Sequence, residues 1–203
     1  AIERGATDFF TKPVALGELK VMVKRLVEAR KLKREAEKLR SEDVTAKSFH
    51  GIIGSTEPMR RIFETVEKTA RSDLAFLVTG ETGTGKEEIA RLVHLLSGRD
   101  GDMVVVNCAA IPDNLLESEV FGYEKGAFTG AQQVKPGKFE LAERGTMVFD
   151  EIGEMSPALQ AKLLRVIETK EVERLGDVKK RKADVRVIAT TNRELQKEMR
   201  DGR

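Results

Sequence analysis

Apolar residues follow two alternating patterns over most of the chain. Short, nearly continuous apolar runs lie at residues 74–79, 103–107, 147–150 and 185–190, and each predicts a buried strand. The segments between them carry apolar residues at helical spacing, as in residues 85–96. Buried strands separated by helices predict an α/β fold with a parallel sheet and flanking helices.

The N-terminal part has a different pattern. The pattern of residues 1–13 predicts the end of a helix, a turn and a short strand, followed by a Lys-Pro pair. Apolar residues then recur at spacings of three and four up to Leu39, which predicts one long helix with Lys and Arg on its flanks. Its apolar stripe fits a short coiled-coil dimer seam and a solvated linker helix equally well. Residues 41–48 are polar and irregular, so a second domain begins near Phe49.

Composition narrows the setting of the chain without identifying its function. The 36 basic and 34 acidic residues nearly cancel to a net charge of +2, which gives no signature of polyanion binding. The single cysteine, Cys108, excludes an intrachain disulfide, and no apolar run approaches the ~18 residues that a membrane span needs. We therefore expect a protein of the reducing cytoplasm that does not bind a membrane.

A glycine-rich turn follows the first predicted strand. Its residues fit the phosphate-binding loop at every position but the last, and they are Gly80, Glu81, Thr82, Gly83, Thr84, Gly85, Lys86 and Glu87. The glycines let successive N–H groups face a β-phosphate at the start of a helix, and Lys86 reaches the β- and γ-phosphates. Glu87 replaces the Ser or Thr whose hydroxyl usually ligates magnesium. We therefore expect Glu87 to bind the metal in another way, for example through a water.

Two carboxylates lie at the end of the strand predicted at residues 147–150. Open α/β sheets bind ligands at the C-terminal ends of their strands, which places Asp150 and Glu151 at the same edge as the phosphate loop. Asp150 can hold Mg²⁺ directly or through water, and Glu151 can orient and polarise the water that attacks the γ-phosphate. The two motifs together predict an ATPase that uses ATP and Mg²⁺.

The order of the motifs carries a specific resemblance. The segments GETGTGKE, NCAAIP, ESEVFGYEKGAFTGA, FDEIGEM and ATTN occur in that order within residues 50–203. This part of the chain resembles the AAA+ domain of bacterial enhancer-binding proteins, the NtrC-like activators of sigma-54 RNA polymerase, in which glutamate at position 87 is normal. The first residues, which include GATDFFTKP, resemble the last strand of a two-component receiver domain.

The resemblance implies three parts. Residues 1–25 are expected to end a receiver domain, 26–48 to form the linker helix, and 49–203 to form a sigma-54-interacting AAA+ ATPase domain that stops before the arginine fingers and the lid. In the family these arginines reach into the ATP site of a neighbouring subunit, and an arginine finger raises the rate by roughly 10³ to 10⁵. We therefore expect weak ATP hydrolysis by residues 1–203 alone and a hexamer or heptamer ring in the longer protein.

Further site residues follow from the resemblance one at a time. Ile52 and Ile53 match the segment that packs beside adenine. Asn107 matches the switch asparagine, which can hold the catalytic glutamate away from its water until the partner is engaged. Thr191 and Asn192 match the sensor that reads the γ-phosphate.

Small residues surround one aromatic in the segment GAFTGA, which comprises Gly126, Ala127, Phe128, Thr129, Gly130 and Ala131. Because the glycines and alanines add little bulk, we expect Phe128 and Thr129 to lie at the tip of a loop. The resemblance implies that this tip contacts sigma-54 and moves with nucleotide state. An isolated segment of this kind would more simply be a turn with a core aromatic, and only the flanking ATP motifs favour the loop interpretation.

The resemblance also implies partners for the longer protein. They are sigma-54, a sensor histidine kinase through the receiver domain, other copies of the protein through the linker helix and the ring, and enhancer DNA through a C-terminal domain absent from this chain. Two other classes share part of the pattern. A generic AAA+ remodelling ATPase has both nucleotide motifs without GAFTGA, and a regulatory dimerisation module accounts only for residues 1–45. The full set of motifs favours an ATP-dependent transcriptional activator of a two-component system.

Overall fold

The computed structural model describes residues 23–24, 27–28, 31 and 48–200. It divides into two units, residues 1–56 and 57–203, and each is described by itself. In the first unit the described residues before Ser48 are helical, and β1 (Ser48–Phe49) pairs antiparallel with β2 (Ile52–Ile53). Most of the predicted receiver segment, residues 1–25, and most of the predicted linker helix, residues 26–48, lie outside the described residues.

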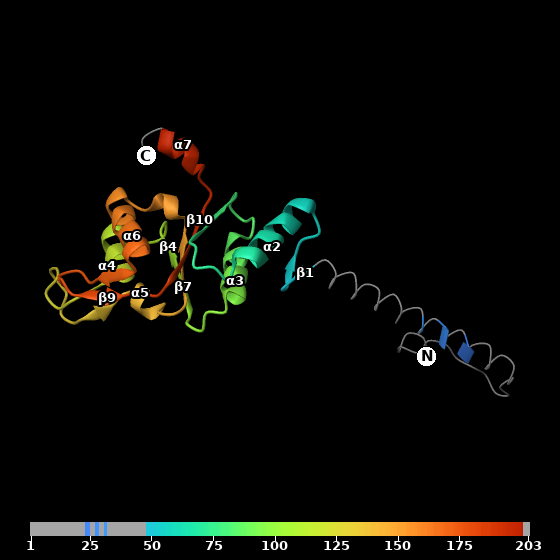
Figure 1. Cartoon of the computed structure of the whole chain (residues 1–203), viewed down its shortest axis with the longest axis horizontal. Helices are drawn as coiled ribbons and strands as arrows, with labels where there is room; N and C mark the ends of the chain where they lie inside the picture. The colour runs from blue at the N-terminus through green and yellow to red at the C-terminus, as the bar shows by residue number, and fades with distance from the viewer. Residues whose placement is uncertain (1–22, 25–26, 29–30, 32–47, 201–203) are drawn as a thin grey trace, which may run out of the picture. The chain divides into compact units, whose positions relative to one another are not determined.

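A sheet of four parallel strands forms the centre of the second unit (Figure 1). The strands are β3 (Phe76–Thr79), β4 (Met103–Asn107), β7 (Thr146–Asp150) and β10 (Arg186–Thr191). Their order is β3-β10-β7-β4, so β10 lies between the strand of the phosphate loop and the strand of the two acids. The predicted parallel α/β sheet is confirmed. β3 begins at Phe76, two residues later than the apolar run, and because it is an edge strand it is only partly buried, contrary to the predicted buried strand.

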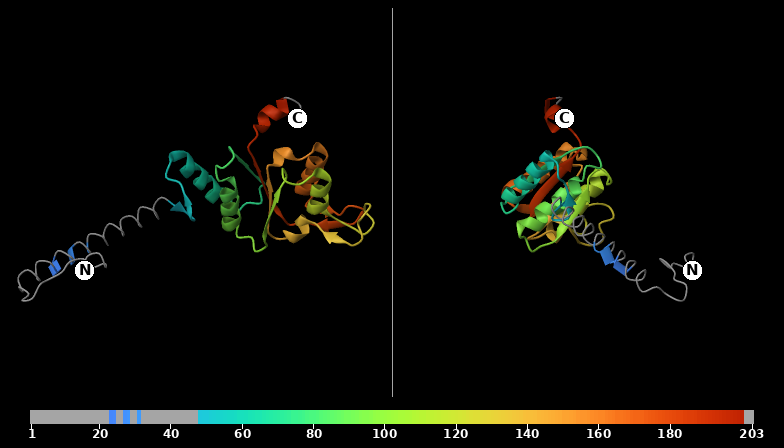
Figure 2. Two further views of the ribbon diagram at one scale, coloured as in Figure 1. Left: turned by 180° about the vertical axis from the view of Figure 1, so that it is seen from behind. Right: turned by 90° about the vertical axis from the view of Figure 1, so that its right-hand side faces the viewer.

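Helices cover both faces of this sheet (Figures 1 and 2). One face carries α2 (Glu57–Thr69) and α3 (Lys86–Ser97), and the other carries α4 (Asp113–Phe121), α5 (Lys138–Leu141) and α6 (Pro157–Thr169). The 3-10 helix η2 (Ile152–Glu154) follows β7, and α7 (Leu195–Arg200) follows β10. Pro157 starts α6, where no helical partner for its missing N–H is needed, and Gly98 ends α3 with a φ of 71°. Within the described residues, none of these helices combines the length and apolar character that crossing a membrane requires.

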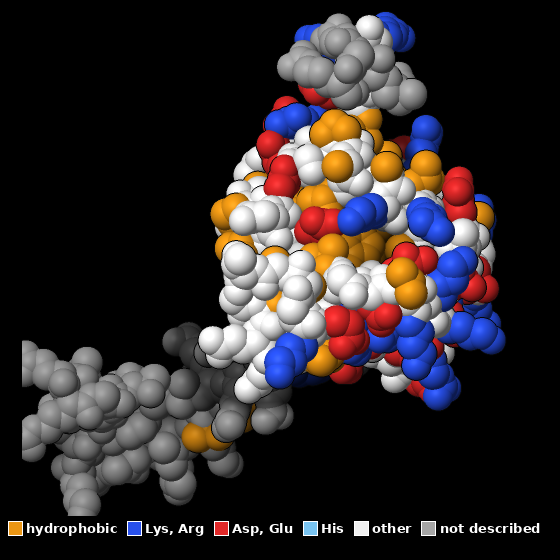
Figure 3. Space-filling model, turned by 90° about the vertical axis from the view of Figure 1, so that its left-hand side faces the viewer, with side chains coloured by type: hydrophobic (Ala, Val, Ile, Leu, Met, Phe, Trp, Pro, Cys, Tyr) orange, Lys and Arg blue, Asp and Glu red, His pale blue; other side chains and the backbone are white. Residues whose placement is uncertain are grey.

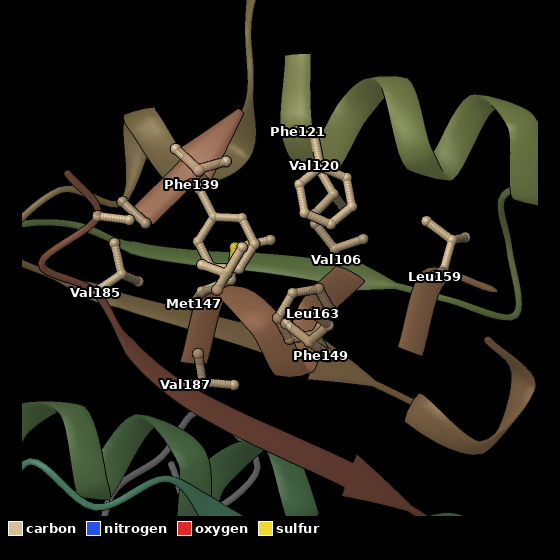
Figure 4. Packing of buried hydrophobic residues seen from close by; sticks show 14 of the residues in the cluster. Val106, Val120, Phe121, Phe139, Met147, Phe149, Leu159, Leu163, Val185 and Val187 are labelled. Carbon is tan, nitrogen blue, oxygen red and sulfur yellow. The ribbon is translucent and has the colours of Figure 1, made fainter. Parts of the chain in front are cut away.

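Aromatic rings fill the core between the sheet and the helices α4, α5 and α6 (Figure 4). Phe139 of α5 is 1% exposed, and its ring centroid lies 5.9 Å from that of Phe121 and 6.0 Å from that of Phe149. Leu159 and Leu163, one turn apart on α6, belong to the same cluster. Because protein interiors are close-packed, the packing of Phe149 against these side chains holds β7, and the acids at its end, firmly against the helices.

Two short hairpins extend from this core. β5 (Gly122–Tyr123) pairs with β6 (Lys135–Pro136), β8 (Glu171–Glu173) pairs with β9 (Lys180–Lys182), and one further bridge joins the two hairpins. GAFTGA lies in the loop between β5 and β6. On the face of the molecule shown in Figure 3, positive and negative side chains are mixed, in agreement with the small net charge.

Candidate nucleotide-binding site

The phosphate loop connects β3 to α3 at the C-terminal edge of the sheet. Gly83 and Gly85 have φ angles of 81° and 83°, in the left-handed region that side chains disfavour. Lys86 is the first residue of α3, so the free N–H groups at the start of the helix adjoin the loop. This arrangement can bind a phosphate group.

The side chain of Lys86 is buried inside the loop and is 9% exposed. Its Nζ donates to the backbone oxygens of Gly80 at 3.0 Å and of Glu81 at 3.1 Å. Nζ also lies 3.7 Å from Oε1 of Glu151. The loop therefore holds a positive charge in a fixed position, next to a carboxylate that follows another strand.

Three polar side chains lie in a row across the ends of β4, β7 and β10. Asn107 is paired in register with Asp150, and Thr190 comes one residue after the partner of Phe149. Asp150 accepts a hydrogen bond at each oxygen, from Nδ2 of Asn107 at 3.0 Å and from Oγ1 of Thr190 at 2.5 Å. The plane of the carboxylate is therefore fixed from both sides.

Glu151 follows with an unusual backbone conformation, φ 53° and ψ 53°, which residues other than glycine rarely adopt. Its side chain is 18% exposed, and its Oε2 accepts the backbone N–H of Asn192 at 3.1 Å. The side chain of Asn192 in turn donates to Oγ1 of Thr82 at 3.3 Å. The structure thus brings together the phosphate loop, both acids and the residue that follows β10.

The resemblance pairs Asn107 with Glu151, whereas in the structure Asn107 contacts Asp150, the residue before it. Its amide nitrogen donates to Asp150, while its Oδ1 accepts two backbone N–H groups of the following turn at 2.9 and 3.1 Å. Glu151 has other partners in this structure. The role of Asn107 in holding Glu151 away from water stays a prediction.

The other predicted site residues have different surroundings. Glu87, predicted as a metal ligand, is 56% exposed and accepts a 2.7 Å hydrogen bond from Arg91 one turn further along α3. Thr191 is buried, and its hydroxyl accepts the N–H of Arg193 at 3.1 Å. The segment Ile52–Ile53 forms β2 in the first unit, so its contact with adenine stays a prediction.

Asp150 has the chemistry of a magnesium ligand. In phosphate sites Mg²⁺ is usually bound by one or two carboxylates together with substrate phosphates and several waters. Each Asp150 oxygen accepts one hydrogen bond and keeps a further lone pair, so the carboxylate fits this role. The described part of the chain contains no group of three or more His, Cys, Asp or Glu side chains that could hold a metal without a substrate.

The GAFTGA segment forms a closed turn. The N–H of Gly126 donates to the carbonyl of Ala131 at 2.9 Å, and the N–H of Ala131 donates to the carbonyl of Phe128 at 3.0 Å. Phe128 is 46% exposed, and its ring packs edge-on against Tyr123 with the centroids 5.0 Å apart. The aromatic side chain therefore reaches the surface while one neighbour anchors it.

An ion-pair network ties the base of this loop to the second hairpin. Arg174 donates to both oxygens of Glu140, at 2.8 and 2.6 Å, and to Glu124 at 3.0 Å. Arg181 donates to Glu124 at 3.2 Å and to Asp177 at 2.8 Å. Hydrogen bonding to Arg174 lowers the pKa of Glu140 below its ordinary value of 4.5. Two residues before GAFTGA, Glu124 is thus bonded to Arg174, which directly follows β8, and to Arg181 of β9.

We expect Arg174→Met to destabilise the fold by about 3 kcal/mol at pH 7, because the partly buried carboxylate of Glu140 loses the guanidinium that bonds both its oxygens, while Glu124 keeps Arg181. The pKa of Glu140 is lower in the folded state, so its contribution is present above pH 4.5 and is lost as pH falls through the folded pKa. The variant should therefore lose less stability than the parent between neutral pH and acid pH. Urea unfolding at several pH values measures both effects.

Arg165→Met is the matched control for this experiment. Arg165 is 65% exposed and lies 3.8 Å from Glu173, and such exposed pairs contribute about 0–1 kcal/mol. Equal acid sensitivity of Arg174→Met and the parent would show that the Arg174 pair does not set the pKa of Glu140.

Two features of the site were absent from the sequence prediction. Thr190 belongs to the ATTN segment, but the resemblance gives a role only to Thr191 and Asn192, and the apolar pattern places Thr190 inside a strand. Arg174 gave no signal, because its partners are 34 and 50 positions away in the sequence.

The site combines a glycine-rich phosphate loop at the start of α3 with two acids at the end of β7, and β10 lies between the two strands that carry them. This combination defines a P-loop ATPase domain of the AAA+ class. Residues 52–203 match the family described as the Sigma-54 interaction domain. The chain belongs to this family.

Individual relatives agree with this assignment. The chain is 45% identical over 203 residues to the regulatory protein AtoC of Escherichia coli strain K12, covering 100% of this chain and 44% of that protein. It is 48% identical over 176 residues to the Nif-specific regulatory protein of Herbaspirillum seropedicae, covering 86% and 32%. The crystal structure of NtrX from Brucella abortus in complex with ATP superposes with a TM-score of 0.67 at 35% identity, covering 99% of this chain and 42% of that chain. The chain thus spans less than half the length of these relatives.

Proposed function

We propose that this chain is the ATP-driven part of a cytoplasmic transcriptional activator of sigma-54 RNA polymerase, controlled by a two-component system. The observation that carries the proposal is the hydrogen-bonded connection from the phosphate loop through Asn192 to Glu151, in a chain that also exposes Phe128 of GAFTGA. Membership of the Sigma-54 interaction domain family supports it. The relative named NtrX binds ATP in its crystal structure, which supports nucleotide binding by this chain.

In the proposed reaction the phosphate loop and the start of α3 bind the β-phosphate, and Lys86 exchanges its loop carbonyls for β- and γ-phosphate oxygens. Mg²⁺ bound with ATP would neutralise charge on the phosphates, and Asp150 would hold it, with Glu87 as the second predicted ligand. Glu151 orients a water and accepts its proton while the water oxygen attacks the γ-phosphorus and ADP leaves.

The nucleotide state would reach GAFTGA through β4 and α4. Asn107 ends β4 and donates to Asp150, and α4 leads from that region to β5 and its loop. A γ-phosphate near Asn192 and Glu151 would add negative charge beside the row of Asn107, Asp150 and Thr190. It would thereby favour one arrangement of these three side chains over another. Phe128 would then contact sigma-54 in only one nucleotide state.

We propose further that the natural full-length protein containing this chain acts as a hexamer or heptamer ring. A neighbouring subunit would supply arginines to each ATP site, which would make hydrolysis by residues 1–203 alone weak. The receiver segment would receive the signal of a sensor kinase, and the linker helix would form a dimer. A DNA-binding domain outside this chain would bind the enhancer.

Phe128→Ala in the full-length protein should weaken binding of sigma-54 at least about 30-fold in the presence of ADP and a metal-fluoride analogue of the transition state, because exposed aromatic anchors carry much of the energy of an interface. Binding is measured by fluorescence anisotropy with labelled sigma-54, and ATP hydrolysis by the same variant should persist.

Leu141→Ala is the matched control, since Leu141 is 53% exposed and lies outside the loop. Full sigma-54 binding by Phe128→Ala would remove the contact role from GAFTGA. Equal weakening by Leu141→Ala would indicate a change of the fold and not of the interface.

A further inference from the structure

Thr190 is a buried polar residue at the centre of the site. It is 1% exposed and lies on β10, one residue after the register partner of Phe149, which puts it beside Asp150. We propose that Thr190 is a positioning residue that holds both acids of the ATP site with a single hydroxyl. The inference rests on the proposed roles of Asp150 and Glu151 in hydrolysis.

The hydroxyl of Thr190 makes two contacts with different functions. It donates to Oδ1 of Asp150 at 2.5 Å and accepts the backbone N–H of Glu151 at 3.3 Å. A hydroxyl has one hydrogen to donate. A carboxylate such as that of Asp150 carries no hydrogen and can therefore only accept. Hydrogen bonds to an ionised carboxylate are shorter and stronger than bonds between neutral groups, so the hydroxyl is oriented by Asp150.

The contact with Glu151 acts on the backbone. Glu151 has a φ of 53°, in the left-handed region that a residue with a side chain rarely adopts, and its surroundings must hold it there. The N–H of Glu151 donates to Thr190 on one side of the residue, and its carbonyl accepts the N–H of Glu154 at 3.0 Å on the other. The conformation sets the direction in which the catalytic carboxylate leaves the backbone.

Thr190 also connects the acids to the residues expected to contact the γ-phosphate. Thr191 and Asn192 follow it directly, and the N–H of Asn192 donates to the Glu151 carboxylate at 3.1 Å. The end of β10 therefore holds Glu151 at both its backbone and its side chain, and holds Asp150 at one oxygen.

The test is Thr190→Val in the full-length protein, which keeps the shape of the side chain and removes the hydroxyl, with Thr190→Ser as the variant that restores it. Loss of a residue that orients a metal ligand typically costs 10- to 100-fold in metal affinity or activity. We expect kcat of Thr190→Val to fall roughly 10- to 100-fold and that of Thr190→Ser to stay within about 3-fold of the parent.

A second readout does not depend on turnover. ATP affinity is measured by calorimetry with Mg²⁺ and with EDTA, and the ratio of the two reports how well Asp150 is placed. This ratio should fall roughly 10-fold or more for Thr190→Val and should be unchanged for Thr190→Ser. Lys86→Ala is measured alongside, to test the ATP site itself.

Thr146→Val is the matched control. Thr146 is fully buried at the start of β7, and its Oγ1 lies 2.8 Å from Nδ1 of His94, at the opposite end of the strand from Asp150. This change should lower thermal stability without changing the Mg²⁺ ratio. If Thr190→Val matched the parent while Lys86→Ala was inactive, or if Thr146→Val altered the ratio as Thr190→Val does, the positioning role would be overturned. Normal hydrolysis by Lys86→Ala would instead overturn the proposed ATP site.

Discussion

Replacing Glu151 by glutamine is expected to lower ATP hydrolysis by the full-length protein roughly 10²- to 10⁴-fold while ATP binding is retained, because the side chain loses its ability to accept a proton. Glutamine keeps the size of the side chain and an oxygen that can accept the N–H of Asn192, so the ground-state arrangement should persist. Steady-state phosphate release measures the rate, and calorimetry measures binding.

Glu154→Gln provides the control for this prediction. Glu154 lies three positions later in η2, and its carboxylate is 2.6 Å from Arg193, outside the hydrogen-bonded row. Its loss should leave hydrolysis within about 2-fold, since exposed ion pairs contribute little. A Glu151→Gln protein that kept a tenth or more of the parent rate would show that another group activates the water.

The sequence predicted those parts of the site that are set by short segments. The phosphate loop needs positive φ angles at Gly83 and Gly85, and a glycine pattern before a helix makes that requirement visible. Asp150 and Glu151 directly follow an apolar run, so their place at the edge of the sheet followed from the strand alone.

The remaining features depend on contacts between distant segments. Thr190 and Asp150 are 40 positions apart, and only the order β3-β10-β7-β4 makes them neighbours. The left-handed conformation of Glu151 could not be predicted, because a glutamate gives no local signal for it. The contact of Glu87 is by contrast local, because Arg91 lies one turn further along α3 and donates to it at 2.7 Å.

Replacing Lys86 by alanine is expected to weaken ATP binding by residues 1–203 at least about 100-fold, because it removes a nearly buried positive charge from the place where the phosphates bind. The change also removes the cation 3.7 Å from Glu151, so the repulsion between that carboxylate and the γ-phosphate would be less well offset. Calorimetric titration with a slowly hydrolysed ATP analogue measures the loss.

Lys68→Ala tests whether a general loss of positive charge could explain such a result. Lys68 is 76% exposed on α2 and lies 3.8 Å from Glu64, so its removal should leave ATP affinity unchanged. The fold should tolerate Lys86→Ala, because the ammonium bonds only to loop carbonyls and one acid, and circular dichroism can check this. If a folded Lys86→Ala protein bound ATP as tightly as the parent, the phosphate-loop assignment would fail, and the roles of Asp150, Glu151 and Thr190 that depend on it would fail as well.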